Sequence, residues 1–358
     1  MVDIIIIGGG IAGISAAAHL SSLGEVVVLE SEEVIGYHAT GRSAAIYVGS
    51  YGNSTINELN AASLPFFTDP SHQLLSNRDF MLLASKNQKM AFKKDIESLN
   101  LTEISTEMAI GKVPIINSLA LGFAAVTSET RDIDTNQMLQ VYVKEAKRNK
   151  SKIITNAKVT QIIKTGSLWR VVTQTDEYIA PIVVNAAGAW VKKVAELAEA
   201  SCIDFQPYRR SVVRIPAPVD KDISGWPMMI GAGESWWAKP DAGKLMVSPS
   251  EEYPMEPHDA WADDLVLAEG LARYEEMMTV PVTHVENSWA GLRTFAPDRS
   301  LVVGFDSVVK GFFWLGGQGG YGFQTAPAVS ELAKQIINGE RTTLASGVVS
   351  ELSPDRFI

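Results

Sequence analysis

The chain has 358 residues, 46% hydrophobic and 20% charged, a composition typical of an ordinary globular protein that is large enough for two domains or for one domain with a large insertion. Its net charge of −10 argues against a nucleic-acid-binding surface, because such surfaces neutralise phosphates with basic side chains. One cysteine excludes an intrachain disulfide and a cysteine-rich zinc site, and the five histidines show no HExxH-like spacing, so we predict no metal site.

The first element predicted in chain order is a buried strand at residues 2–7. Residues 4–18 are apolar, but they lack the basic flank of a secretory signal and are too short and too glycine-rich for a membrane-spanning helix of about 20 residues. The unbroken β-branched run instead suits a parallel strand covered on both faces. A helix over 14–23 and a second strand over 25–29 are predicted to follow.

A glycine-rich turn joins this strand to the helix. Gly8, Gly10 and Gly13 match G-x-G-x-x-G, in which the glycines permit a tight turn, close approach to a pyrophosphate and close packing of the helix. Glu30 ends the second strand, where a carboxylate can accept a hydrogen bond from a ribose hydroxyl. The order of strand, turn, helix, strand and acid predicts dinucleotide binding, whereas the glycines alone would also fit a strand turn without a cofactor. The residues predicted here to contact the cofactor are Gly8, Gly10, Ile11, Ala12, Gly13 and Glu30.

The segment after Glu30 favours FAD over NAD. An NAD-binding domain would continue more simply with a helix and a strand, whereas this chain continues with GYHATGRSAA. Residues 41–45 supply a turn, a cation and a hydroxyl that are predicted to open a helix and to contact phosphate or flavin. A capped helix with a surface arginine is the alternative.

Two later segments repeat the pattern of a strand followed by small residues. IVVNAAGAW at 182–190 is a predicted third strand that leads into a close backbone approach. A strand over 311–315, a glycine turn over 316–322 and a helix up to about Ile337 follow near the C-terminus, and this helix N-terminus would favour negative charge on reduced flavin. Three such turns spread along the chain indicate one extended cofactor.

These motifs, together with RDIDT (131–135), WAGLRTF (289–295) and GGQGGYGFQT (316–325), resemble the FAD-dependent amine and D-amino acid oxidoreductases. That family includes D-amino acid oxidase, glycine oxidase and sarcosine oxidase, and the similarity is strongest to bacterial D-arginine dehydrogenases. The resemblance implies an α/β fold in which a glutathione-reductase-type FAD-binding Rossmann domain (1–76, 126–199 and 286–358) is interleaved with a substrate domain. The latter (77–125 and 200–285) is α+β with a mostly antiparallel sheet.

The resemblance also implies further contacts with a non-covalent FAD. No cysteine lies near the C-terminal glycine turn, so the covalent flavin link of sarcosine oxidases is not expected. Beyond the first motif, the residues expected to contact FAD are Gly41, Arg42, Ser43, Ala44, Ala45, Val159, Ala187, Gly188, Trp190, Gly291, Gly319, Gly320, Tyr321, Gly322 and Gln324.

Such enzymes oxidise an amino acid by hydride transfer from Cα to flavin N5, giving an imino acid that hydrolyses to a 2-oxo acid and ammonia. An arginine fork suits the substrate carboxylate, and the family's carboxylate-binding arginine falls at Arg293. Arg210 matches a second substrate-contacting arginine and Tyr51 a tyrosine over the substrate amine. Gly320 and Gln324 match positions on the substrate side of the flavin. The alternatives are a surface arginine at Arg293 and a core aromatic at Tyr51.

Three departures from the D-arginine dehydrogenase pattern make the predicted pocket more apolar. Phe80 replaces the acid that receives a guanidinium, Ile46 replaces a histidine and Trp237 replaces a tyrosine. Asp79 precedes Phe80, but adjacent strand residues face opposite sides, so Asp79 is not expected to substitute for the missing acid. An unpaired guanidinium would lack compensation for its desolvation, so we predict a neutral or apolar D-amino acid as substrate.

Other functions stay open at this point. They are oxidation of a secondary amine such as sarcosine or glycine, a flavoprotein whose FAD has a structural or sensing role, and an NAD-dependent dehydrogenase. The electron acceptor is expected to be O2 or a quinone or respiratory carrier. With no signal or transmembrane stretch in the sequence, the expected location is the cytoplasm, with loose membrane association as an alternative.

Overall fold

The predicted N-terminal strand lies at the centre of a parallel sheet in the computed structural model, which describes residues 1–357. All four residues of β1 (Ile4–Ile7) are buried, which confirms a strand covered on both faces, although it begins two residues later than predicted. Only the edge strand β20 runs antiparallel to its neighbour. Across the sheet the order is β20 (Val302–Phe305), β21 (Phe312–Gly316), β13 (Ile182–Asn185), β1, β2 (Val26–Leu29) and β9 (Lys152–Ile154).

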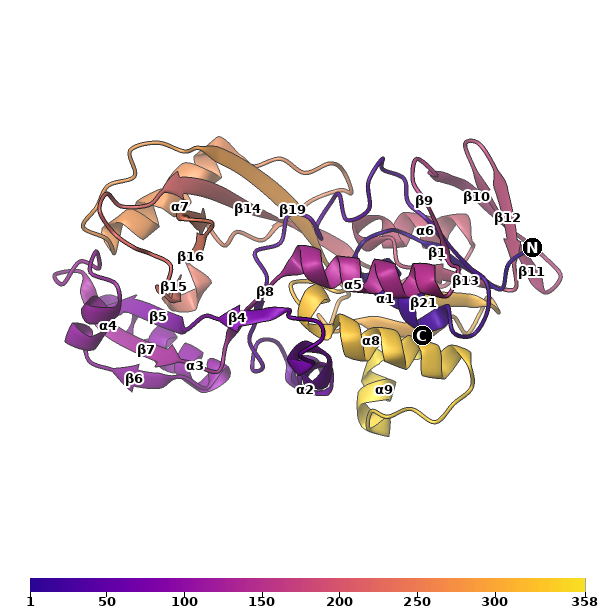
Figure 1. Ribbon diagram of the computed structural model, residues 1–358, viewed down its shortest axis with the longest axis horizontal. Helices are drawn as coiled ribbons and strands as arrows, with labels where there is room; N and C mark the ends of the chain where they lie inside the picture. Colours follow the sequence, from indigo (N-terminus) through magenta and orange to yellow (C-terminus); the bar gives the residue numbers. More distant parts are fainter. Residues whose placement is uncertain (358) are drawn as a thin grey trace.

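Different layers cover the two faces of this sheet. Ile4 and Ile6 pack in one hydrophobic cluster with α1 (Ile11–Leu20), α5 (Thr135–Arg148) and α8 (Gly322–Ile337). Ile5 and Ile7 pack in another, with α6 (Val191–Leu197) and the antiparallel sheet of β10 (Val159–Thr165), β11 (Leu168–Thr173) and β12 (Glu177–Ala180). Figure 1 shows α1, α5 and α8 along the lobe that holds β1. Because both faces are buried, the strand shows no apolar–polar alternation.

The segment at 41–45 is not helical, so that part of the prediction is wrong. The Gly41 N–H donates to the Gly36 carbonyl and closes a turn, and the chain then extends into β3 (Ile46–Tyr47). β3 pairs with β8 (Arg131–Ile133), which also pairs with β4 (Leu75–Asn77), so the extended backbone finds its hydrogen bonds there. The next helix, α2 (Ser54–Thr68), packs against α8 and α9 (Ser346–Leu352).

The second lobe is built on a larger sheet that is antiparallel except between β15 and β5. This confirms the predicted combination of a Rossmann-type parallel sheet with a mostly antiparallel one. The strands, in order across the sheet, are β18 (Tyr253–Pro254), β14 (Gln206–Pro216), β17 (Lys244–Ser248), β16 (Trp237–Asp241), β15 (Met228–Gly231), β5 (Phe80–Ser85), β7 (Leu121–Thr127) and β6 (Thr102–Ile104), and β19 (Asn287–Phe295) pairs with β14.

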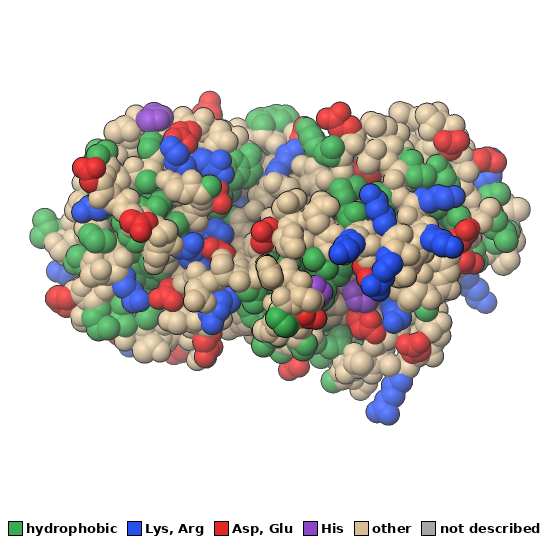
Figure 2. Space-filling model, in the orientation of Figure 1, with side chains coloured by type: hydrophobic (Ala, Val, Ile, Leu, Met, Phe, Trp, Pro, Cys, Tyr) green, Lys and Arg blue, Asp and Glu red, His purple; other side chains and the backbone are tan. Residues whose placement is uncertain are grey.

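Three helices lie in this second lobe: α3 (Lys89–Leu99), α4 (Thr106–Lys112) and α7 (Asp264–Glu276). Figure 1 shows β14 and β19 running side by side from this lobe toward the lobe that holds β1. Figure 2 shows acidic and basic side chains mixed over both lobes of this face. None of the helices in residues 1–357 combines the length and apolar character needed to cross a membrane.

Candidate functional site

A cavity of about 1050 Å³ lies where the two lobes meet. Glu30 lines it at one end, and Arg210 and Phe80 line it at the other. Small-molecule pockets are commonly about 300–1,000 Å³. This volume, drawn out along both lobes, suits an extended ligand with a small substrate at its far end.

The glycine turn at the first end requires glycine for steric reasons. Gly8 has a φ of +111°, and a Cβ there would collide with the Ala186 carbonyl oxygen. A Cβ on Gly13 would collide with the Gly8 carbonyl oxygen, so Gly13 permits close packing of α1 and does not itself line the cavity. Gly10 lines the cavity, and among residues 1–357 its N–H has no protein acceptor. The start of α1 thus offers a donor to an anion.

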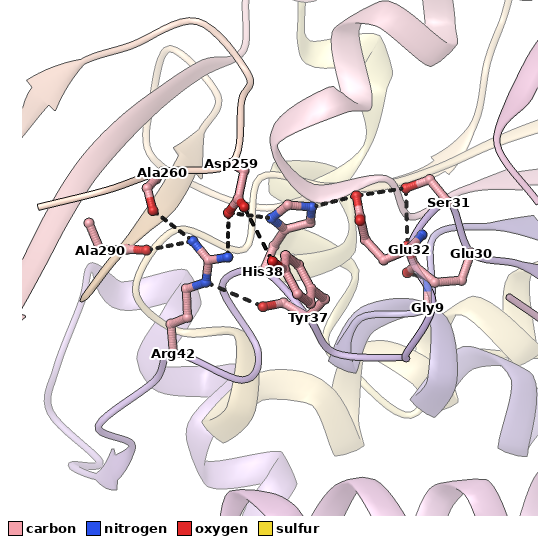
Figure 3. Close-up of polar contacts among 10 residues, drawn as sticks. All are labelled: Gly9, Glu30, Ser31, Glu32, Tyr37, His38, Arg42, Asp259, Ala260 and Ala290. Carbon is pink, nitrogen blue, oxygen red and sulfur yellow. Dashed lines mark hydrogen bonds and ion pairs between the residues drawn. The ribbon is translucent and has the colours of Figure 1, made fainter. Parts of the chain in front are cut away.

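Glu30 is fixed beside this turn by main-chain donors. Its Oε2 accepts from the Gly9 N–H at 2.7 Å and its Oε1 from the Glu32 N–H at 2.9 Å (Figure 3). The side chain is buried yet lines the cavity. A carboxylate held in this way can accept a hydrogen bond from a ribose hydroxyl, as its position after β2 predicts.

Arg42 lines the cavity but uses most of its donors within the protein. Its Nη1 donates to the carbonyls of Ala260 at 2.8 Å and Ala290 at 2.9 Å, and its Nη2 donates to Asp259 at 2.5 Å (Figure 3). Its Nε donates to the Tyr37 carbonyl at 3.3 Å. An arginine has five N–H groups, and four are accounted for here. At most one N–H of Arg42 therefore remains free for the predicted contact with phosphate.

The three small-residue turns converge on this cavity, although they are far apart in the sequence. Residues that follow β13, precede α8 and lie on β19 all line it. Gly41 and Tyr321, by contrast, do not line it, and the Tyr321 ring packs 5.4 Å from the ring of Tyr51. The remaining predicted cofactor residues that line the cavity are Ser43, Ala44, Ala45, Val159, Ala187, Gly188, Trp190, Gly291, Gly319, Gly320, Gly322 and Gln324.

The far end of the cavity is largely apolar. Phe80 and Trp237 are buried there, and Ile46 lines the same wall. Sequence reasoning missed several lining residues because no local motif marks them, and only the order of strands in the sheet brings them together. They are Val48, Leu99, Val212, Met228, Ile230 and, at the exposed rim, Glu234.

Asp79 lies outside this pocket. Its Oδ2 pairs with the Lys112 Nζ at 2.9 Å, whereas the Phe80 side chain lines the cavity. The prediction that Asp79 does not replace the missing acid is confirmed. The reason is the alternation of side chains where the chain enters β5.

Two arginines occupy the far end. Arg210 on β14 and Arg293 on β19 come from paired antiparallel strands, with Arg210 opposite Gly291 and Tyr208 opposite Arg293. In residues 1–357 the Arg293 side chain makes no ion pair or hydrogen bond, and a Cβ on Gly320 would lie 3.1 Å from its Nη1. The end of the cavity therefore holds a cation whose charge no acid neutralises directly.

Arg210 is almost fully buried, and its positive charge is only weakly compensated by hydrogen bonds and nearby acids. Its Nη2 lies 3.3 Å from Glu252 Oε1, and its Nε has no hydrogen-bond partner in the described residues. Burial, and then the nearby charge of Arg293, lower the pKa of Arg210 to about 10. The guanidinium remains protonated at neutral pH, so the pair presents two positive charges to the cavity.

Gln324 and Tyr51 are linked through the main chain. The Gln324 Nε2 donates to the Tyr51 carbonyl at 3.4 Å, and its Oε1 accepts from the Val48 N–H at 3.3 Å. Gln324 therefore fixes the loop that carries Tyr51, in addition to lining the cavity. Burial raises the pKa of the neighbouring Tyr321 to about 12, so this phenol stays neutral.

Neither a thiol nor a metal-binding group of side chains lines the cavity in the described chain. The single cysteine, Cys202, is exposed and does not line it. Throughout residues 1–357, no three His, Cys, Asp or Glu side chains are grouped so that they could hold a metal ion. Besides Arg210, Arg293 and Tyr51, the titratable side chains that line the cavity include His38, His258, Lys158 and Lys193.

Comparisons with known proteins agree with this architecture. The chain is 24% identical to 4-methylaminobutanoate oxidase (formaldehyde-forming) of Paenarthrobacter nicotinovorans, over 94% of this chain and 43% of that protein, so it spans less than half of that relative's length. It superposes on L-proline dehydrogenase from P. horikoshii with a TM-score of 0.84, 22% identity and coverage of 99% of this chain and 97% of that one. For glycine oxidase from Geobacillus kaustophilus the TM-score is 0.85 at 17% identity, with coverage of 100% and 99%.

These matches do not single out D-arginine dehydrogenase. The family model of the FAD dependent oxidoreductases, DAO, matches residues 3–336, which is nearly the whole chain. The tight Gly8 turn, the unpaired Gly10 N–H and the fixed Glu30 carboxylate fit the phosphates and ribose of such a dinucleotide. The chain therefore belongs to the FAD-dependent oxidoreductase (DAO) family and binds FAD.

Proposed function

We propose that this chain catalyses the oxidative deamination of a D-amino acid with a neutral or apolar side chain, giving an imino acid and then a 2-oxo acid and ammonia. The observation that carries the proposal is the Arg293 guanidinium, which faces the far end of the cofactor cavity without an acid partner among residues 1–357. A half-buried cation without an acid partner favours an anionic ligand, and a carboxylate matches its planar donors.

The residues around Arg293 would then orient the substrate. FAD, when bound, accepts a hydride from the substrate Cα. The two arginines hold the carboxylate, and this fixes the position of Cα relative to the ring. The apolar wall of Phe80 and Trp237 excludes water from the same end. We assign no catalytic base, because an unprotonated amine can lose hydride directly.

The apolar wall supports a substrate without a basic side chain. The acid nearest to Phe80 in sequence, Asp79, pairs with Lys112 away from the cavity. Glu234 lies at the rim but is exposed, so it stays solvated and compensates little for burying a guanidinium beside Phe80. The D configuration rests on the resemblance in the sequence motifs and not on this geometry.

An anaerobic screen tests the proposal. The purified holoenzyme is mixed with D- and L-forms of alanine, methionine, leucine, phenylalanine and arginine, and bleaching of the flavin absorbance is followed. The proposal expects bleaching by D-methionine, D-leucine or D-phenylalanine, with D-arginine slower. Faster reaction of D-arginine would contradict the apolar assignment, and reaction of the L-forms alone would contradict the D assignment. Admission of air afterwards shows whether O2 accepts the electrons or a quinone-type carrier must be supplied.

Oxidation of a secondary amine is the second candidate. It is favoured by the similarity to 4-methylaminobutanoate oxidase and by the structural likeness to glycine oxidase and L-proline dehydrogenase. The same screen discriminates when sarcosine, glycine, L-proline and 4-methylaminobutanoate are included. Bleaching by these compounds, but not by D-amino acids, would replace the primary proposal. A chain in which FAD has only a structural or sensing role would bleach with none of them.

A further inference from the structure

A segment of the substrate lobe runs along the FAD cavity without belonging to a sheet or helix. Residues 255–263 connect β18 to α7, and His258 and Ala260 of this segment line the cavity. In the described chain, no backbone N–H from 256 to 262 donates to a backbone carbonyl. Side-chain contacts therefore decide where the segment lies, and such segments open more readily than sheet strands.

Arg42 makes the central contacts with this segment. One guanidinium binds the Ala260 carbonyl and the Asp259 carboxylate of the segment, together with the Ala290 carbonyl of β19 (Figure 3). Ala260 is buried in a small apolar cluster with Ala290 and Leu292. Arg42 thus joins three pieces of chain that form one wall of the cofactor cavity.

Asp259 extends these contacts toward the ribose end. The Tyr37 hydroxyl donates to Asp259 Oδ2 at 3.3 Å, and the His38 Nδ1 lies 3.9 Å from Oδ1. The other ring nitrogen of His38 lies 3.0 Å from Glu32 Oε1, and Glu32 adjoins Glu30 (Figure 3). Hydrogen bonding to Arg42 holds the pKa of Asp259 below its usual range, so the acid is ionised at neutral pH.

We infer that His258 and Ala260 of this segment belong to the cofactor site and that Asp259 acts as a positioning residue that retains FAD. Asp259 itself does not line the cavity, so it works by fixing the segment through Arg42, Tyr37 and His38. Releasing the segment would open the wall along the cofactor. The inference rests on FAD binding alone and is independent of which amine is oxidised.

The test is the rate at which the holoenzyme releases FAD, measured by the fluorescence of free FAD after dilution. Asp259→Asn keeps the size and shape of the side chain but removes the negative charge that Arg42 binds. FAD should then be released about five- to tenfold faster. Glu256→Gln is the matched control: it removes one charge from the same segment at an exposed side chain that makes no side-chain contact, and release should be unchanged. Asp259→Glu should restore slow release at least in part.

A rival explanation is that Asp259 affects FAD release by a route that does not involve Arg42. In the inferred arrangement the double variant Arg42→Met, Asp259→Asn releases FAD no faster than Arg42→Met alone, because both substitutions break the same contact between Arg42 and Asp259. A double variant whose acceleration is the product of the two single effects would overturn the inference. Thermal unfolding of the FAD-free proteins should be equal for wild type and Asp259→Asn. If Asp259→Asn destabilised the FAD-free protein as much as it destabilised the holoenzyme, Asp259 would have a general structural role. That result would also overturn the inference.

Discussion

The guanidinium groups of Arg210 and Arg293 reach the same end of the FAD cavity from paired antiparallel strands. The two charges are close enough that Arg293 contributes, after burial, to lowering the pKa of Arg210 to about 10. Of the two arginines, only Arg210 contacts Glu252, at 3.3 Å, and Glu252 also pairs with Arg299 at 2.9 Å. This unbalanced pair is the strongest evidence in the molecule for an anionic substrate group.

Replacing Arg293 with Met should remove the main partner of that anionic group while leaving FAD in place. The loss of a charged contact of about 2–4 kcal/mol corresponds to a fall of roughly 30- to 10³-fold in kcat/KM. The measurement compares kcat/KM on the best substrate of the screen with the FAD content from absorbance. Arg170→Met, which disrupts an exposed ion pair with Glu177, is the control and should change neither. Normal turnover in Arg293→Met would show that Arg293 does not bind the substrate.

A second prediction concerns the apolar wall. Phe80→Glu would place an acid where the pocket is now apolar, and the ratio of D-arginine to D-methionine turnover should rise at least about tenfold, because the guanidinium gains a partner for its buried charge. Phe80→Leu changes the volume without adding charge and should leave D-arginine poor. Asp79→Asn should also leave the ratio unchanged, since Asp79 pairs with Lys112 outside the pocket. If Phe80→Glu left the ratio of D-arginine to D-methionine turnover unaltered, the substrate side chain would have to bind away from Phe80.

The glycine turn gives a third prediction. Gly8→Ala forces a side chain into a φ of +111° and against the Ala186 carbonyl, and it should weaken FAD binding by at least about tenfold. Equilibrium titration of the FAD-free protein, followed by flavin fluorescence, measures this affinity. Gly111→Ala in α4 is the control, because a Cβ there meets nothing within 4 Å. Unchanged affinity in Gly8→Ala would show that the turn does not approach the cofactor.

The pH dependence of stability gives a fourth prediction. Burial lowers the pKa of His19 from 6.5 despite its hydrogen bond to the Ser15 carbonyl and the nearby Glu331. The unfolded chain therefore binds this proton more readily, so this contribution to stability is complete above pH 6.5 and is lost as the pH falls below it. Urea unfolding at several pH values should show a flatter profile between pH 5 and 7 for His19→Gln. The exposed His284→Gln should retain the wild-type slope.

The fifth prediction concerns how FAD is attached. The single cysteine is exposed and away from the cavity, so no thiol is in place for a covalent link. Acid or heat denaturation followed by centrifugation should therefore leave the yellow flavin in the supernatant. Flavin that stayed with the precipitated protein would reveal a covalent bond through another side chain.

The sequence by itself determined the centre of the FAD-binding lobe. A β-branched run, a G-x-G-x-x-G turn and an acid after the next strand are local patterns, and local sterics and hydrogen bonding are enough to specify β1, the turn and the position of Glu30. The separation of Phe80 from Asp79 also followed from strand alternation alone. Boundaries differed by one to three residues, and the helix expected to open at 41–45 was replaced by a turn and by extended backbone leading into β3, which pairs with β8.

Only the tertiary structure decided how the rest of the site is assembled. Met228 and Ile230 have no motif, and they line the far end because β15 pairs with β5. The sequence predicts Arg42 as a cofactor ligand, yet its N–H groups donate to Ala260 and Asp259, more than 200 residues away. Such contacts depend on how the two lobes pack, and local sequence patterns carry no information about partners at that separation.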